Sequence, residues 1–322
     1  MITDPDWHAR STDDCPVFVL ASFVAACSVR VDRLPARGET LAADDFLLEA
    51  GGKGLNVAVA LRRLGVAVDG LLAVGADWFG GLAAGVLATN DLPAAMLCRM
   101  PGRSGAGVGL IDRAGDTVIA VYPGANASLA AEDVVRCAGQ IARARYVVAQ
   151  FEIGDAPIAA AFAAAPQATR VLNPSPFRPI LPAILADTDL LVVNETEADA
   201  LAQSLGIDPD PDRRALATAL FQAGVQMLVV TAGERDARLW QPGLAPILQP
   251  SFAVAAIDGI GAGDAFLAGL VAALAEGTPP AEALRLAAAC GALAATRHGV
   301  LAALPTRAQR DGLVQTNVFA SP

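Results

Sequence analysis

Six short apolar segments recur along the chain, each bounded by polar residues, glycine or proline and separated from the next by alanine-rich stretches with helical spacing. They are residues 17–20, 70–74, 146–149, 170–172, 190–193 and 228–231. Strands that are apolar on both faces and alternate with helices are typical of a parallel sheet covered by helices on its two sides. The pattern predicts an α/β fold with a central, mostly parallel sheet.

Two regions, residues 29–48 and 105–122, break this pattern because they alternate apolar and polar positions, and the second contains a turn at residues 112–116. Such alternation predicts antiparallel strands that expose one face. We therefore expect a small β-sheet formed by residues 29–48 and 105–122, beside a large α/β domain of residues 17–28, 49–104 and 123–322. The run 17–29 is interpreted as one strand continuing into a second, and residues 1–16 as a poorly ordered extension.

Composition narrows the class of protein. The 322 residues are 54% hydrophobic and 17% charged, which is enough apolar material for a large core. The net charge of −10 argues against nucleic-acid binding, which depends on basic patches, although a nucleotide held locally by loops is compatible with it. Five scattered cysteines, an acidic start without a signal peptide, and an apolar run 17–29 too short to span a bilayer predict a cytoplasmic protein with reduced thiols and no membrane partner.

The segment Asp258-Gly259-Ile260-Gly261-Ala262-Gly263-Asp264-Ala265-Phe266 places three glycines directly before an apolar helical run. Glycines allow close approach to a ligand, and the free N–H groups of a helix start bind anions. The amides of Gly261, Ala262 and Gly263 are thus candidates for an anion hole. Asp264, which the helix start should keep strongly ionised, could take a proton from a hydroxyl while these amides hold a phosphate. The alternative is an Asp that only caps a helix after a glycine turn.

A second glycine-rich segment, Gly51-Gly52-Lys53-Gly54-Leu55-Asn56, also leads into a helical pattern. Lys53 is the only lysine in the chain. A compact ammonium can meet phosphate oxygens where a planar guanidinium would not fit, although a chance lysine in a glycine turn is the alternative. Neither segment is a Walker A loop or a dinucleotide fingerprint, because Gly54 and Asp264 stand at positions that those motifs give to other residues.

With both segments, the chain resembles the ribokinase (PfkB) family of carbohydrate kinases from about Val17 to about Pro305. Further segments match the family's motifs in the family's order: Arg37-Gly38-Glu39-Thr40, Val74-Gly75-Ala76-Asp77-Trp78-Phe79-Gly80, Pro123-Gly124-Ala125-Asn126, Leu172-Asn173-Pro174-Ser175-Pro176, Asn194-Glu195-Thr196-Glu197 and Val230-Thr231-Ala232-Gly233. The resemblance implies a ribokinase-like fold in which the small sheet is a lid over a sugar, and often a clasp between two subunits of a homodimer. It implies an ATP-dependent sugar kinase with Asp264 as the base.

The resemblance also assigns roles to other residues. Thr231 and Gly233 would contact the nucleotide, with Lys53 near its phosphates, and Asn194 and Glu197 would organise Mg²⁺ through water. The last pair is equally a capping box at a helix start. The sugar would be held by Gly51, Gly52, Asn56 and Glu152. A candidate potassium site matches Asp258 and the carbonyls of Ile260, Ala294, Arg297 and Gly299, although Ala303 replaces a serine of ribokinase.

One departure concerns the acceptor. Where ribokinase has Gly-Ser-Ile-Asn-Ala-Asp, with Asn and Asp binding sugar hydroxyls, this chain has Ala21-Ser22-Phe23-Val24-Ala25-Ala26. Val24 and Ala26 thus replace two polar contacts, which leaves another sugar, a sugar acid or a nucleoside open as the acceptor. The alternatives to a sugar kinase are a nucleoside or small-alcohol kinase of the same family and a non-catalytic sugar or nucleotide sensor. Asp264 argues against the sensor, because a binding protein needs no base.

Overall fold

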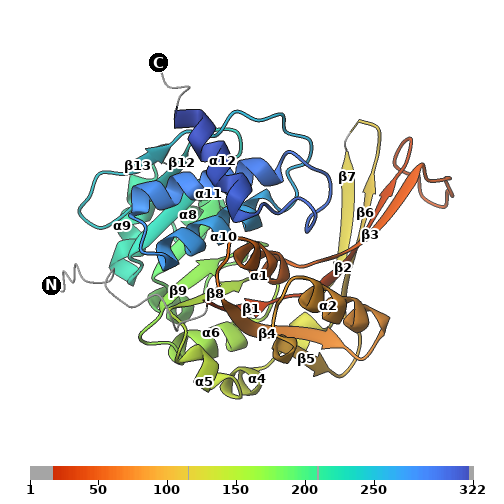
Figure 1. The fold of residues 1–322 in the computed structure, drawn as a ribbon, viewed down its shortest axis with the longest axis horizontal. Coiled ribbons are helices and arrows are strands. Elements are labelled where there is room, and N and C mark those ends of the chain that lie inside the picture. Colours follow the sequence, from red (N-terminus) through yellow and green to blue (C-terminus); the bar gives the residue numbers. More distant parts are fainter. Residues whose placement is uncertain (1–16, 115, 209, 319–322) are drawn as a thin grey trace.

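The computed structural model describes residues 17–114, 116–208 and 210–318, so the expected N-terminal extension lies outside the described residues. Its centre is a nine-stranded sheet with the order β13-β12-β11-β10-β9-β8-β1-β4-β5 (Figure 1). The pairs from β5 to β11 are parallel, and only β12 and β13 join in antiparallel pairs. The strands are β1 (Val17–Ala21), β4 (Val68–Gly75), β5 (Leu97–Met100), β8 (Tyr146–Gln150), β9 (Thr169–Asn173), β10 (Leu190–Asn194), β11 (Met227–Thr231), β12 (Ala237–Trp240) and β13 (Ile247–Gln249).

All six strands predicted from apolar runs are present, as β1, β4, β8, β9, β10 and β11. The prediction missed β5, β12 and β13, which lie at or next to the sheet's edges. Strands at an edge are covered less completely and lack the continuous apolar run of a central strand. Leu248 of β13, for example, is 50% exposed.

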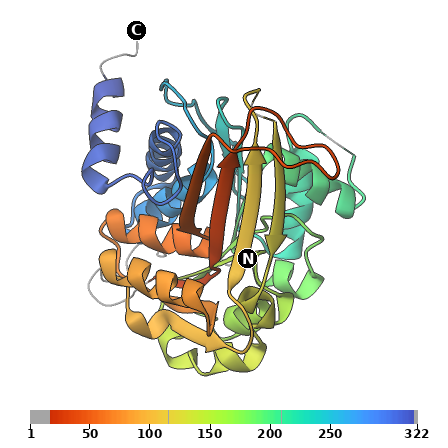
Figure 2. The same cartoon turned by 90° about the vertical axis from the view of Figure 1, so that its right-hand side faces the viewer.

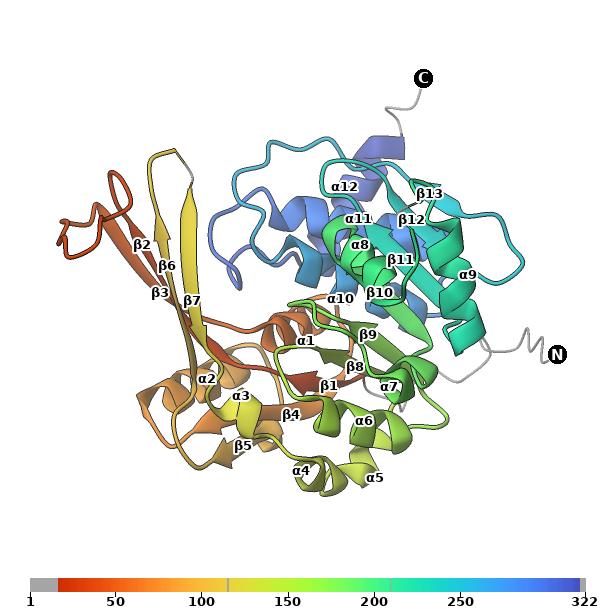
Figure 3. The same ribbon diagram turned by 180° about the vertical axis from the view of Figure 1, so that it is seen from behind.

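Helices cover both faces of the large sheet. Alternate residues of β1 belong to different cores: Val17, Val19 and Ala21 pack with helices α1 and α10, whereas Phe18 and Leu20 pack with the helices of the other face. Figure 1 shows the first face, with α1, α10, α11 and α12, and Figure 3 the second, with α6, α7, α8 and α9. The helices are α1 (Lys53–Arg63), α2 (Trp78–Thr89), the 3₁₀ helix η2 (Ala94–Met96), α3 (Ala125–Ser128), α4 (Ala131–Val135), α5 (Ala138–Ile141), α6 (Asp155–Ala163), α7 (Pro182–Ala186), α8 (Glu195–Ser204), α9 (Arg214–Ala223), α10 (Ala262–Ala275), α11 (Pro280–Ala294) and α12 (Arg307–Val318).

A separate four-stranded sheet with the order β3-β2-β6-β7 stands beside the large domain, and its outer face is seen in Figure 2. Its strands are β2 (Val24–Arg30), β3 (Asp45–Gly51), β6 (Gly105–Ile111) and β7 (Thr117–Tyr122). Two details differ from the sequence expectation. Residues 24–28 and 49–51, assigned to the large domain, lie in the small sheet, and β2 pairs with β6 in parallel, so the sheet is mixed. The hairpin β2–β3 and the hairpin β6–β7 are antiparallel as expected.

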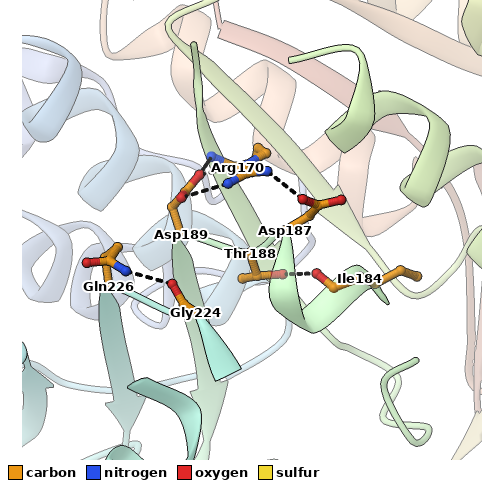
Figure 4. A network of polar contacts seen from close by, with 7 residues as sticks. All are labelled: Arg170, Ile184, Asp187, Thr188, Asp189, Gly224 and Gln226. Atoms are coloured by element: carbon orange, nitrogen blue, oxygen red, sulfur yellow. Dashed lines mark hydrogen bonds and ion pairs between the residues drawn. The ribbon is translucent and has the colours of Figure 1, made fainter. Parts of the chain in front are cut away.

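A polar cluster joins the amino-terminal ends of β9 and β10 (Figure 4). Arg170 donates from Nε to Asp189 at 2.8 Å and from its Nη1 atom to Asp187 at 2.8 Å, while its backbone N–H donates to Asp189 at 2.7 Å. These contacts raise the pKa of Arg170, chiefly through the hydrogen bond to Asp189, and they hold the edge of the sheet opposite the strand ends described below.

Among the described residues, the cysteines Cys27, Cys98, Cys137 and Cys290 are free thiols. In the same ranges, no helix combines the length and the apolar character that crossing a membrane requires.

Candidate active site

The carboxyl ends of β1, β8, β10 and β11 lie along one edge of the large sheet, because these strands are parallel. Ser22 and Glu152 come shortly after β1 and β8, and Asn194 and Thr231 are the last residues of β10 and β11. The amino-terminal ends of α1 and α10 join the same edge. Ligands of open α/β sheets bind at this edge, so the structure brings both glycine-rich segments to the expected place.

Helix α10 begins after Gly261, whose φ of +80° is left-handed. A side chain there would also meet Val300 Cγ1 at 3.1 Å from its Cβ, so glycine fits the turn on both counts. The Ala262 amide donates to the Gly259 carbonyl at 3.2 Å, so of the three amides predicted to form the anion hole, this one is already engaged. A Cβ on Gly263 would have nothing within 4 Å, which leaves the front of the helix start open to a ligand.

Asp264 lies in the first turn of α10 and is 5% exposed. Asn56 Nδ2 donates to its Oδ2 at 2.7 Å, and Lys53 Nζ lies 3.8 Å from its Oδ1. Burial raises the pKa of Asp264, while Lys53 and the Asn56 hydrogen bond lower it and the Glu152 and Glu197 carboxylates raise it again. Burial therefore acts on the pKa of Asp264 in the opposite direction to the helix start, which was expected to favour the ionised form.

Two glycines at the start of α1, Gly52 at its N-cap and Gly54 in its first turn, allow the helix to lie against β1. A Cβ on Gly52, at φ +109°, would be 2.4 Å from the Ser22 carbonyl oxygen, and one on Gly54 would be 2.4 Å from the Ala21 Cα. This close approach points Lys53 and Asn56 at Asp264. Asn56 Oδ1 is buried without a hydrogen-bond partner among the described atoms, so it is ready to meet a donor from a ligand.

Glu152 lies on the opposite side of the same loop. Its Oε2 accepts from Ser22 Oγ at 2.5 Å and from the Lys53 backbone N–H at 2.7 Å, while Ser22 Oγ accepts from the Gly54 N–H at 3.1 Å. The sequence predicted Glu152 but not Ser22. The signal for Ser22 was its place in the Ala-Ser pair directly after a buried strand.

Asn194 and Glu197 form a capping box at the start of α8, which was the alternative to their expected role at Mg²⁺. The Glu197 N–H donates to Asn194 Oδ1 at 2.8 Å, and the Asn194 N–H donates to Glu197 Oε2 at 2.9 Å. Thr231 pairs directly with Asn194 across the adjacent strands. Gly233 follows at φ +61° with open space around it. Within the described ranges no group of three or more His, Cys, Asp or Glu side chains is arranged as a metal site.

The segments of the candidate potassium site lie together. The Asp258 N–H donates to the Ala295 carbonyl at 3.1 Å, and Asp258 Oδ1 accepts from the Ile260 N–H at 3.0 Å. His298 Nδ1 lies 4.0 Å from Asp258 Oδ2, and its side chain is 64% exposed. Ala294 ends α11, Arg297 precedes His298, and Gly299 follows it at φ +83°.

A carboxylate that the sequence did not single out, Glu49 of β3, meets this loop. A Cβ on Gly299 would be 2.7 Å from Glu49 Oε1, and the Val300 backbone amide hydrogen-bonds to the Glu49 carboxylate. Burial raises the pKa of Glu49, the Val300 bond lowers it and the nearby Asp258 raises it. Glu49 was missed because its position depends on strand pairing between segments, which no local pattern reveals.

Val24 and Ala26 lie on β2, where Val24 pairs with Gly51 and Gly105, and Ala26 with Glu49 and Gly107. Residues paired in this way share a face of the sheet. A Cβ on Gly51 would lie 3.9 Å from Ala26 Cβ, and one on Gly107 would lie 3.4 Å from Val24 Cγ1. The two apolar replacements thus lie on the face that carries Gly51 into the site.

The chain is similar to known proteins along most of its length. A ribokinase from Bacillus subtilis is 30% identical over 297 residues, covering 90% of this chain and 98% of the relative. A deoxyribokinase from Salmonella typhi is 28% identical, covering 94% of this chain and 99% of the relative. The solved structure of Arabidopsis thaliana ribokinase complexed with ribose and ATP matches with a TM-score of 0.85 at 27% identity, covering 94% of this chain and 99% of that one. Residues 16–307 match the pfkB family carbohydrate kinases, and the chain belongs to that family of phosphotransferases with an alcohol acceptor.

Proposed function

We propose that this protein transfers the γ-phosphate of ATP to a hydroxyl of a sugar or a closely related polyol. The proposal depends on one observation. The Asp264 carboxylate is buried at the start of α10, and the Lys53 ammonium and the Asn56 amide both lie against it. Phosphoryl transfer needs a base at the accepting hydroxyl and positive charge near the moving phosphate, and this cluster supplies both.

In the proposed mechanism, Asp264 accepts the proton of the attacking hydroxyl. Its raised pKa helps here, because a stronger base takes up the proton more readily once it is ionised. Lys53 stabilises negative charge on the transferred phosphoryl group, and the open amides at the start of α10, at Gly263 above all, receive phosphate oxygens.

ATP would lie along the ends of β10 and β11, beside Thr231 and Gly233, where the backbone is open. Asn194 and Glu197 would hold Mg²⁺ through water, since their side chains already bond each other's backbone amides. The ion, when bound, neutralises charge on the phosphates. Asp258 and the carbonyls of Ile260, Ala294, Arg297 and Gly299 would bind potassium, and Glu49 adds a carboxylate beside that loop.

The acceptor would be held by Gly51, Gly52, Asn56 and Glu152. The unpartnered Oδ1 of Asn56 supports this, because a buried acceptor atom gains most from a hydroxyl donor. Val24 and Ala26 replace polar contacts of ribokinase, so we expect ribose to be a poor substrate and a deoxy sugar or a nucleoside to fit the apolar wall better. The relative named deoxyribokinase favours the first of these.

The test is ATP turnover over a panel of pentoses, deoxy sugars, hexoses, sugar acids and nucleosides, followed by Asp264→Asn with the best acceptor. The substitution keeps the size and the hydrogen bond to Asn56 but removes proton acceptance, so kcat should fall about 10²–10⁴-fold. Calorimetric ATP binding serves as the control and should stay near the wild-type value. Turnover within about threefold of wild type would show that Asp264 is not the base, whereas ATP binding without turnover on any acceptor would favour a sensor.

A further inference from the structure

The face of the small sheet that carries Ala26 also carries Glu49. The two residues are paired directly across β2 and β3, so their side chains project from the same face. Where β2 presents a methyl group, the neighbouring strand therefore presents a carboxylate. An acid missing at one position is present at the adjacent one.

The same face is turned toward the catalytic end of α10. The Glu49 carboxylate lies over Gly299 and receives the Val300 amide, and Val300 in turn is the residue that a side chain on Gly261 would strike at 3.1 Å. Glu49 thus lies between the small sheet and the turn that begins α10. Its placement depends on Gly299, because a Cβ there would come within 2.7 Å of Glu49 Oε1 and force the carboxylate to move.

Glu49 has bonding capacity left for a ligand. An ionised carboxylate offers about four lone-pair sites, and the Val300 amide uses one of them. The side chain is only partly buried, so further donors can reach it.

Charge around the site narrows the class of acceptor. Glu49 is close enough to Asp258 for the two carboxylates to repel, and Glu152 and Asp264 repel in the same way within the site. Lys53 is already paired with Asp264, and His298 lies beside Asp258. A negative charge on the acceptor would face these carboxylates of the site. Their repulsion disfavours sugar acids and phosphorylated sugars as acceptors.

From these contacts we propose that Glu49 is a specificity-determining residue that hydrogen-bonds acceptor hydroxyls in place of the acid that β2 lacks at Ala26, and that the acceptor is an uncharged polyol with an apolar edge toward Val24. The inference rests on the proposed kinase function and names the acceptor class of that same site.

The experiment compares wild type, Glu49→Ala, Glu49→Gln and the matched control Asp45→Asn, using the best neutral acceptor of the panel together with ribose and gluconate. Asp45 lies on the same strand and the same face, at the exposed far end of β3, so it controls for the loss of one negative charge. We expect Glu49→Ala to raise the acceptor KM about 10- to 100-fold while kcat and the ATP KM change by less than about threefold. The acceptor KM of Glu49→Gln should lie between those of wild type and Glu49→Ala, and that of Asp45→Asn should match wild type. Gluconate should be a poor acceptor for all four proteins.

A second variant tests the exchange of position directly. Adding Ala26→Asp to Glu49→Ala should recover part of the lost acceptor affinity, because it returns a carboxylate to the paired position on the same face. An unchanged acceptor KM in Glu49→Ala would overturn the inference, and so would an effect confined to potassium or ATP dependence, since Glu49 would then only hold the 299–300 loop. Acceptor binding measured by calorimetry without nucleotide separates the two proposals: loss of binding in Glu49→Ala without turnover in wild type would refute the kinase function and keep the role of Glu49.

Discussion

At the scale of single residues, the groups that raise and lower the pKa of Asp264 determine how the proposed kinase activity should depend on pH. Burial raises its pKa, and the Lys53 ammonium at 3.8 Å is the largest influence that lowers it. In the proposed mechanism Asp264 acts as the base only when it is ionised, so kcat/KM should rise with pH through the pKa of Asp264 in the free enzyme.

Replacing Lys53 by Met removes the positive charge that favours the ionised carboxylate, so the pKa of Asp264 rises further. The acidic limb of the kcat/KM profile should shift to higher pH, in addition to a fall in kcat at every pH. Profiles between about pH 4 and pH 8 for wild type, Lys53→Met and Lys53→Arg measure the shift, with the arginine variant expected to keep most of the acidic limb in place. An unmoved limb in Lys53→Met would mean that another group controls it.

The same raised pKa predicts a gain in stability from Asp264→Asn. A carboxyl whose pKa is higher in the folded state binds its proton more tightly there, so folding stability falls as pH rises from the unfolded pKa through the folded one. Above that window the buried charge is a constant cost, which asparagine removes. The melting temperature of Asp264→Asn should therefore exceed that of wild type by a few degrees at pH 7, and the difference should vanish near pH 3. Equal melting temperatures at both pH values would indicate that Lys53 and Asn56 fully offset the cost of burial.

At the scale of elements, the central strands could be predicted from sequence because each is a local apolar run between breaks. Lys53 and Asp264 could each be expected at a helix start, because the glycine motif before each helix is local. Their closeness to each other joins segments far apart in the sequence and is a finding of the structure. The pairing of β2 with β6 could not be predicted in the same way, because it joins segments about 80 residues apart and produces no periodicity in either. Glu49 and its contact with Gly299 depend on that sheet and were therefore missed.

The hydrogen bond of the Ala262 amide is a second feature that could not be predicted from the sequence. The glycine pattern predicted a helix start that binds anions, but not the local turn in which one N–H bonds to the Gly259 carbonyl. Which amides of a glycine loop stay open depends on its backbone angles, and several sets of angles suit the same sequence.

The close packing of helix α1 against β1 can be tested at Gly54, where a Cβ would lie 2.4 Å from the Ala21 Cα of β1. Gly54→Ala must push the start of α1 away from the strand, so it should lower the free energy of unfolding by about 2–4 kcal/mol and lower kcat through the displaced Lys53 and Asn56. The matched control is Gly85→Ala in α2, where a Cβ meets nothing within 4 Å and alanine should stabilise the helix by about 0.5–1 kcal/mol. Urea unfolding of both variants measures the difference, and equal effects would show that α1 does not depend on close packing at Gly54.

At the scale of the whole molecule, the small sheet is joined to the large domain through a few buried contacts. The Phe23 N–H donates to Asn126 Oδ1 at 2.9 Å, and Asn126 Nδ2 donates to the Phe23 carbonyl at 2.7 Å. This reciprocal pair fixes the point at which β1 continues into β2, so the orientation of the lid is set where the chain leaves the large sheet.

The outer face of the small sheet is turned away from the large domain (Figure 2). Exposed apolar side chains lie on it. Phe46, Val29, Leu110 and Val118 form one row across its four strands, and the side chains at the two ends of the row are 61% and 54% exposed. Exposed apolar surfaces of this kind mark interfaces, and the sequence resemblance implies a clasp between two such sheets. We therefore propose that two copies of the chain pair through this face.

Light scattering after gel filtration tests the pairing, because the chain has a mass of 32.7 kDa and a dimer has about twice that mass. Replacing both Phe46 and Val118 by Lys puts two charges into the apolar row, so the variant should run as a monomer at concentrations where wild type is dimeric. The control is Leu248→Lys, a substitution of an equally exposed apolar residue on β13 at the far edge of the large sheet, which should leave the dimer intact. A monomeric wild type at about 10 µM would refute the pairing, because we expect a dimer that buries this apolar face to dissociate only well below that concentration. Loss of the dimer in Leu248→Lys but not in the double variant would place the interface on the large domain instead.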